Sequence, residues 1–192
     1  KLWGGLLSRG FFVFRPVAML SKIFCNENTM LLNPRYVPLL LQNWSEVNRC
    51  AHRLNSSLAR LQADFPLTGE RLTTEDESLF ERLDAFRVRY ADLQDAIGNK
   101  LFRSILLALD EKSINMADTL SKMEKYGVLS SVDEWRLMRE IRNSFSHDYP
   151  DAEQERAITL NHAWQTAPAL LAVVLAADEY LQQLGVFTGD LQ

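Results

Sequence analysis

A regular spacing of apolar residues between positions 74 and 109 constrains the fold of this chain more than any other feature. These residues recur every three or four positions, so they form one buried face along a single long helix. Thr74 and Glu77 have the Thr-x-x-Glu spacing of a capping box and predict the start of this helix, which we expect to end near Leu109. Gly98 is expected to weaken it by about 1 kcal/mol relative to alanine. The predicted buried positions are Leu79, Leu83, Phe86, Tyr90, Leu93, Ile97 and Leu101.

Helical patterns with defined ends cover the rest of the chain from residue 33 onward. A first helix is predicted from about Val37 to Ala63, with Pro38 in its first turn, and a loop over residues 66–72 follows it. A short helix is predicted next, with Ser113 as its N-terminal cap and Gly127 as its stop.

Two longer helices complete the pattern. Ser131 and Glu134 form a second capping box, and Asp151 is predicted to cap a last helix that reaches Leu184 and stops at Gly185, with a kink at Pro168. No stretch shows the alternation typical of strands. The sequence therefore predicts an all-α fold, an antiparallel up-down bundle of four main helices plus a short one. The helix that Ser131 opens should bury Trp135, Met138, Ile141 and Phe145.

The apolar N-terminal stretch differs in composition from the rest. It is interrupted by Arg9, Arg15, Pro16 and Lys22, so no run reaches the roughly 18–20 apolar residues of a membrane span. A segment that is not native to the protein, a family-specific extension and a signal peptide are the alternatives. The expected parts are an N-terminal extension (1–32), a helical domain (33–185) and a C-terminal tail (186–192).

Charge and cysteine content narrow the classes of protein. A net charge of −4 argues against a protein that coats nucleic acid nonspecifically, so any nucleic-acid site must be a local basic cluster. Cys25 and Cys50 form neither a disulfide framework nor a metal-binding spacing, and we expect reduced thiols in a cytoplasmic protein. The apolar segment 168–181 is too short for a membrane anchor and is expected to be a core or dimer helix, so no membrane partner is predicted.

A basic helix face that leads into a histidine is the strongest candidate for a functional site. Arg136, Arg139 and Arg142 recur every three residues and are expected to form one basic strip, while Pro150 should make the helix end around Ser146 to Asp148. The ordinary interpretation is that such arginines are solvated and that the histidine complements the helix dipole. On an ideal helix Arg142 and His147 lie about 140° apart, so they converge only if the chain unwinds there or a second subunit completes the site.

The motif is longer than an isolated arginine and histidine. Arg142, Asn143, His147 and Tyr149 read as Arg-Asn-x3-His-x-Tyr. This pattern resembles the HEPN family, the higher eukaryote and prokaryote nucleotide-binding domains, and most closely the HepT-type toxins that pair with small nucleotidyltransferase antitoxins. Residues 89–102, "RYADLQDAIGNKLF", also resemble the long second helix of these proteins. The resemblance covers residues 33–184 and leaves the N-terminal extension unexplained.

The resemblance implies a homodimeric, metal-independent endoribonuclease with a HEPN-like fold and RNA as its substrate. It implies that Arg142 and His147 are catalytic. Asn143, Arg139 and Arg136 would support them or bind phosphate. It also implies that a cognate nucleotidyltransferase adenylylates Tyr149 and so silences the nuclease.

Two alternatives stay open. The chain can instead be a noncatalytic module that binds a nucleotide or a partner and acts with a nucleotidyltransferase, because Arg142 and His147 can hold a phosphate without cleaving anything. A metal site at His147 and Asp151 is disfavoured because Pro150 breaks the helical spacing, although Asp148, Glu153 and Glu155 lie nearby in sequence. We expect neither a metal nor a cofactor. The chain also has no glycine-rich phosphate loop and no nucleophile elbow.

Overall fold

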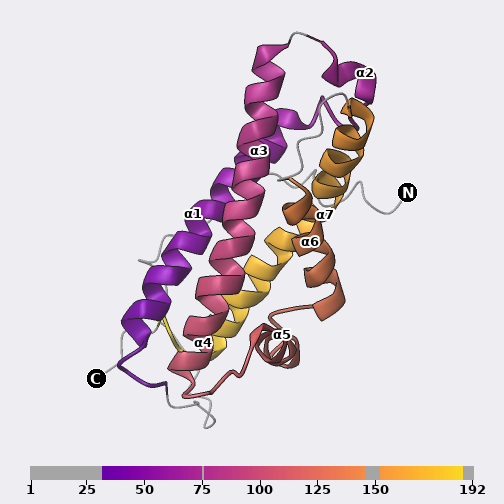
Figure 1. Ribbon diagram of the computed structural model, residues 1–192. Helices are drawn as coiled ribbons and strands as arrows, with labels where there is room; N and C mark the ends of the chain where they lie inside the picture. Colours follow the sequence, from indigo (N-terminus) through magenta and orange to yellow (C-terminus); the bar gives the residue numbers. More distant parts are fainter. Residues whose placement is uncertain (1–31, 75, 146–151, 188–192) are drawn as a thin grey trace.

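The computed structural model describes residues 32–74, 76–145 and 152–187, and these residues form helices joined by short connections, with no strand among them (Figure 1). The all-α prediction is therefore confirmed. The helices are α1 (Val37–Leu61), α2 (Gly69–Leu72), α3 (Glu77–Asp95), the π-helix η1 (Ala96–Leu101), α4 (Phe102–Ala108), α5 (Met116–Lys125), α6 (Val132–Ser144) and α7 (Glu153–Gln183).

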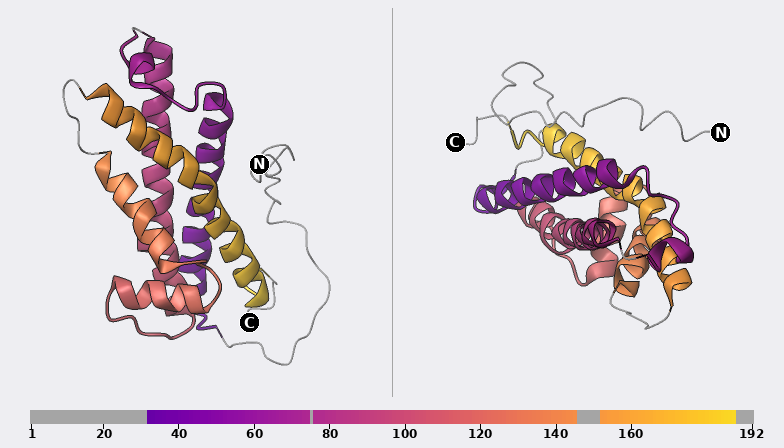
Figure 2. Two further views of the ribbon diagram at one scale, coloured as in Figure 1. Left: turned by 90° about the vertical axis from the view of Figure 1, so that its right-hand side faces the viewer. Right: turned by 90° about the horizontal axis from the view of Figure 1, so that it is seen from above.

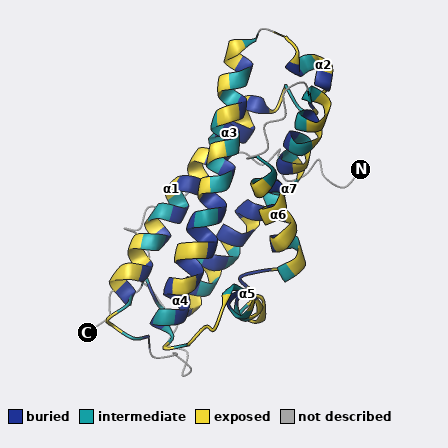
Figure 3. Ribbon diagram, in the orientation of Figure 1, coloured by how far each residue is buried: buried dark blue, intermediate teal, exposed yellow. Residues whose placement is uncertain are grey.

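The α1 and α3 helices lie side by side and run in opposite directions (Figures 1 and 2). At one end the Lys100 ammonium is 2.7 Å from the carboxylate of Glu46, and nearer the other end Arg89 donates to the hydroxyl of Ser57 at 2.7 Å. The α6 and α7 helices cover the other side of α3, and α5 lies across the lower end of α6 (Figure 2). The core lies between these helices, whose facing sides are buried (Figure 3).

The predicted apolar stripe is the centre of this core. All seven of its residues are buried, and they come from α3 and η1. The stripe predicted for α6 is buried at Trp135, Met138 and Ile141, while Phe145 is only half-buried and packs its ring edge-on against Tyr90. Apolar spacing alone was therefore sufficient to identify the packed faces of both helices.

The predicted helix around Leu79 begins and continues differently from the expectation. Asp76 is the N-terminal cap, because its carboxylate accepts from the backbone N–H of Leu79 at 3.0 Å. Thr74 instead donates its hydroxyl to the carbonyl of Arg71, so the predicted Thr74–Glu77 capping box is wrong. The helix is also not α-helical throughout, since η1 interrupts it between residues 96 and 101 before α4 ends at Ala108.

Three other predicted boundaries are corrected by the structure. The first helix ends at Leu61 rather than Ala63, and residues 66–72 are not all loop, because α2 forms there with the Thr68 hydroxyl as its cap. The cap of α5 is Asn115 rather than Ser113, because the Asn115 side chain accepts from the N–H of Asp118.

The remaining predicted ends agree with the structure where it describes them. Ser131 caps α6 by accepting from the N–H groups of residues 133 and 134. The carboxylate of Glu134 instead accepts from the Ser130 hydroxyl, so the predicted box is not reciprocal. Gly127 and Gly185 follow α5 and α7 with positive φ angles, as helix-stop glycines do. The predicted cap Asp151 lies outside the described residues, and α7 continues through Pro168 to residue 183.

Residues 65–72 are fastened to the start of α7. The Asn161 amide accepts from the N–H of Leu67 and donates to the carbonyl of Leu67, both at 2.8 Å. Two residues after Leu67, the N–H of Gly69 donates to the Gln154 side chain at 3.2 Å. The ring of Phe65 stacks on Trp164, with centroids 4.1 Å apart. These contacts connect the turn between α1 and α3 to α7.

Among the described residues, no helix is both long and apolar enough to cross a membrane.

Candidate functional site

The candidate site lies where α6 packs against α3 and η1, along what we call the α3–α6 seam. Residue numbers rise along α6 as they fall along α3 and η1, so the two segments are antiparallel. Because helical side chains recur every three or four residues, contacts spaced in this way put one face of each helix in register. The contacts pair Gly98 with Trp135, Gln94 and Asp95 with Arg142, and Arg87 with Phe145.

Arg142 is held against α3 and does not stand free in solvent. Its Nε donates to Oε1 of Gln94 at 3.2 Å, and its Nη2 donates to Oδ1 of Asp95 at 3.0 Å. Its side chain is 26% exposed, and that of Asp95 is 47% exposed. Hydrogen bonds between charged groups are stronger than neutral ones and fix orientation as well. The ordinary interpretation of a solvated surface arginine therefore does not apply to Arg142.

Gln94 is the buried member of this group, with only 2% of its surface exposed. Its Oε1 must face Arg142, because a guanidinium offers donors only and the amide nitrogen would face it donor to donor. The amide nitrogen, Nε2, is then left buried without a hydrogen-bond partner among the described residues. An unpaired buried donor costs about 1–3 kcal/mol, so the contact with Arg142 comes at the expense of local stability.

The π-helix begins directly after Asp95. Its wider turns change the register between α3 and α4, and π-helical turns often occur at functional sites. Within this region the side-chain amide of Asn99 donates to Oδ1 of Asp95 at 3.2 Å. The same carboxylate oxygen thus accepts from Asn99 and from Arg142, which fixes the Asp95 side chain beside the guanidinium.

Gly98 has a packing role that its helix propensity does not predict. A Cβ atom at this position would lie 2.9 Å from Cζ2 of Trp135. Trp135 is itself buried and packs against Phe102, with ring centroids 5.2 Å apart, so its indole has little freedom to move away. The sequence-based interpretation of Gly98 as a mild weakness is incomplete, because the glycine lets α6 approach closely.

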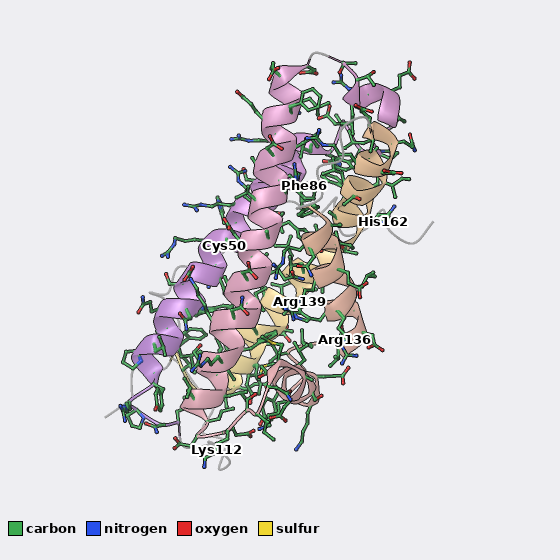
Figure 4. All side chains as sticks on the ribbon, in the orientation of Figure 1. Cys50, Phe86, Lys112, Arg136, Arg139 and His162 are labelled. Atoms are coloured by element: carbon green, nitrogen blue, oxygen red, sulfur yellow. The ribbon has the colours of Figure 1, made fainter. Side chains whose placement is uncertain are left out.

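The three arginines of α6, expected from their spacing to form one basic strip, lie in different surroundings. A step of three residues turns an ideal helix by about 300°, so each arginine lies about 60° around from the one before. Arg136 is exposed and pairs with Asp133 at 2.9 Å. Arg139 is exposed, and within the described residues no ion pair or side-chain hydrogen bond engages it. Figure 4 labels both residues along α6.

Arg139 and Arg142 both line a hollow of about 20 Å³ beside the seam. Of the predicted supporting residues, Arg139 thus shares a surface with Arg142, whereas Arg136 belongs to the lower, solvent-facing part of α6. Asn143 is exposed next to Arg142. The hollow is lined by Gln94, Asp95, Gly98, Asn99, Met116, Trp135, Arg139 and Arg142.

Arg87 is a residue of this region that the sequence interpretation missed. Its Nη2 donates to the carbonyl of Phe145, the C-terminal cap of α6, and its guanidinium lies 5.8 Å from the centre of the Phe145 ring. A cation at the C-terminus of a helix is favourable because the last carbonyls carry partial negative charge. The available signal was that Arg87, Gln94 and Gly98 interrupt the seam face of α3 and η1 at helical spacing.

A second groove, of about 380 Å³, lies between α1 and α3 on the other side of Asp95. Burial raises the pKa of the Cys50 thiol in its lining, so the reactive thiolate is disfavoured at neutral pH. The charged side chains in its lining balance, which gives the groove no net attraction for an anion. These side chains are Arg49, Arg53 and Lys100 on the positive side and Glu46, Asp92 and Asp95 on the negative side.

Several predicted functional residues fall outside the part of the chain that the structure describes. His147 and Tyr149 lie there, as do Asp148 and Asp151 of the disfavoured metal site. Across residues 32–74, 76–145 and 152–187, no three His, Cys, Asp or Glu side chains are grouped so that they could hold a metal ion. The described part of the candidate site therefore consists of Arg142, its acceptors Gln94 and Asp95, and the neighbouring Arg139 and Asn143.

No family model, curated protein or solved structure matches this chain.

Proposed function

We propose that the chain is a metal-independent endoribonuclease of the HEPN type, with Arg142 and His147 as its catalytic residues. The observation that carries the proposal is the pair of hydrogen bonds from Arg142 to Gln94 and Asp95. A guanidinium fixed in orientation is what phosphate recognition requires, and a solvated arginine would not have it. The proposal also assigns these helices to the up-down bundle of that family.

The chemistry uses the 2′-hydroxyl of RNA as an internal nucleophile. His147 accepts the proton of that hydroxyl or donates one to the leaving 5′-oxygen, since the ordinary pKa of histidine, about 6.5, lies near neutral pH. The new bond joins the 2′-oxygen to phosphorus, and the bond from phosphorus to the 5′-oxygen breaks. The products are a 2′,3′-cyclic phosphate and a 5′-hydroxyl. Arg142 remains charged throughout and stabilises the negative charge that builds on the phosphate.

Neighbouring residues supply the rest of the proposed site. Arg139 adds positive charge beside Arg142, Asn143 orients the phosphate, and Arg136 extends the basic surface. A homodimer brings two such motifs to one cleft and removes the need for Arg142 and His147 of one chain to converge.

Regulation is proposed to act through Tyr149. A partner nucleotidyltransferase in the cytoplasm transfers AMP from ATP to its hydroxyl and releases pyrophosphate, and the added bulk and negative charge block the cleft and repel RNA. The nuclease of the toxin is then inactive for as long as Tyr149 carries AMP.

A second candidate function follows from Asp95. Because its carboxylate pairs with Arg142, part of the cationic charge is already neutralised, which suits a module that holds a nucleotide or partner without catalysis. Such a module would bind the nucleotidyltransferase or its nucleotide and leave RNA intact.

Cleavage of end-labelled RNA in EDTA, by wild type and by His147→Ala, separates the two. Intact mass is measured first, because AMP on Tyr149 would mask activity. The nuclease is expected to produce 2′,3′-cyclic phosphate ends that His147→Ala does not produce. Unmodified wild type that binds nucleotide and leaves several RNAs uncut would favour the module.

A further inference from the structure

We propose that Gln94 and Asp95 are positioning residues that grip one edge of the Arg142 guanidinium and leave its other edge for a substrate phosphate. The proposal rests on the proposed function, and it adds two residues that the arginine–histidine motif does not contain. They lie 47 and 48 residues from Arg142 in sequence and come from a different helix.

The atoms that make the two contacts define the edge. A guanidinium has a side edge, formed by the N–H of Nε and one N–H of Nη2, and an end edge, formed by Nη1 and the other N–H of Nη2. Gln94 takes the Nε–H and Asp95 takes Nη2. Within the described residues nothing accepts from Nη1. The end edge therefore keeps the two parallel donors that bind a phosphate bidentately.

The two acceptors differ in burial and charge. Gln94 is buried and neutral, so it orients the guanidinium without cancelling its charge. Asp95 is about half exposed and charged, so it opposes the attraction of Arg142 for an anion, although solvent weakens this effect. We assign orientation chiefly to Gln94 and a reduction of phosphate affinity to Asp95.

The surroundings support a dedicated role for Gln94. It lies among apolar neighbours on the buried face of α3, where its unpaired Nε2 is unfavourable and a leucine would pack without that penalty. Gly98, one turn farther on, permits the close approach that the two hydrogen bonds need. The unpaired Nε2 of Gln94 thus lowers the local stability of the seam, while its Oε1 holds the Arg142 guanidinium.

The test uses the full chain and three variants, Gln94→Leu, Gln94→Glu and Asp95→Asn. Asp92→Asn is the matched control, because it removes the same charge from an exposed position on the same helix, one turn from Asp95. Three quantities are measured: the arginine Nε–H signals by NMR, the kcat and KM of RNA cleavage in EDTA, and the affinity for a 2′-deoxy oligonucleotide that cannot be cleaved.

Gln94→Leu removes the acceptor of Nε, so the Arg142 Nε–H signal is expected to shift to the position of a solvated arginine. The kcat is expected to fall by about 10- to 100-fold, the loss typical of a misplaced catalytic group. Gln94→Glu should keep the Arg142 Nε–H signal of wild type, because its oxygen still accepts from Nε, and should raise KM and the oligonucleotide Kd, because its buried charge cancels part of the charge of Arg142. Asp95→Asn keeps an oxygen that can accept from Nη2 and loses only the charge, so it should leave the Arg142 Nε–H signal unchanged and lower KM and the oligonucleotide Kd by roughly two- to fivefold, the range of an exposed ion pair. Asp92→Asn should change none of them.

The results separate this proposal from the proposed function. If Gln94→Leu folds and keeps both the wild-type Arg142 signal and the wild-type kcat, the positioning role is overturned. Equal changes for Asp95→Asn and Asp92→Asn would show general charge instead of a specific contact and would also overturn it. If wild type cleaves no RNA, the nuclease proposal fails, while the NMR signal and the oligonucleotide Kd still test the grip on Arg142.

Discussion

Gly98 lies directly against the indole of Trp135, so close that a Cβ atom on residue 98 would be 2.9 Å from Cζ2 of that ring. This contact is seven residues along α6 from Arg142, on the same side of the helix. The spacing between α6 and η1 at Trp135 therefore helps to set the spacing at Arg142, which joins the packing of the core to the geometry of the candidate site.

Gly98→Ala is expected to destabilise the protein, although alanine has the higher helix propensity. Overpacking of a rigid core typically costs about 1–3 kcal/mol, which exceeds the gain of about 1 kcal/mol from propensity. Urea unfolding followed by tryptophan fluorescence and circular dichroism measures the difference. The matched experiment repeats Gly98→Ala in a Trp135→Leu background, where the methyl group should be neutral or stabilising. A Gly98→Ala protein more stable than wild type would contradict the packing role.

Asn161→Ala is expected to lower the free energy of unfolding by about 2–3 kcal/mol, since it removes two hydrogen bonds to the backbone of Leu67. Asn43→Ala, which removes a single longer bond of 3.4 Å to the Lys100 carbonyl, should change it by less than about 0.5 kcal/mol. Thermal and urea unfolding compare the two variants. Equal losses would show that the two hydrogen bonds between Asn161 and Leu67 contribute no more to the free energy of unfolding than one weak surface bond.

The Tyr90 phenol makes stability fall at alkaline pH. Burial raises the pKa of Tyr90 to about 12, and its hydroxyl lies 2.9 Å from that of Thr166. Because the folded pKa is above the unfolded value of about 10, the contribution is complete below pH 10 and is lost as the pH rises toward 12. The loss approaches about 2–3 kcal/mol at the upper end.

Urea unfolding between pH 8 and about pH 11.5, in wild type and Tyr90→Phe, tests this expectation. The decrease should be smaller in Tyr90→Phe, though some should remain, because burial also raises the pKa of Tyr180 to about 12. An identical decrease in both proteins would exclude Tyr90 as a source.

Local pattern was enough to predict most of the helices and the buried stripe, because a 3.6-residue period directly reports which face is packed. It was not enough where neighbouring residues compete for one role. Asp76 and Thr74 are both good caps, and the contact of Arg71 with Asp76 at 2.7 Å accompanies the choice of Asp76. The capping-box motif could not show which of the two residues is the cap, because Arg71, which pairs with Asp76, lies in α2 and outside the motif.

The candidate site shows a similar division. The motif identified Arg142, but its acceptors Gln94 and Asp95 lie on another helix, and only packing brings them together. The π-helix and the role of Gly98 likewise depend on the approach of α6, which no local pattern reports. Polar residues on an otherwise apolar seam were the one sequence signal for these contacts.

RNA cleavage by Arg142→Ala in EDTA tests the central claim most directly. The matched control is Arg103→Ala, which removes an exposed arginine from α4, away from the seam. The account predicts a rate about 100- to 1000-fold below wild type for Arg142→Ala, the usual loss of a donor to a developing oxyanion. Arg103→Ala should cleave as wild type does. Cleavage at the wild-type rate by a folded Arg142→Ala protein would contradict the account.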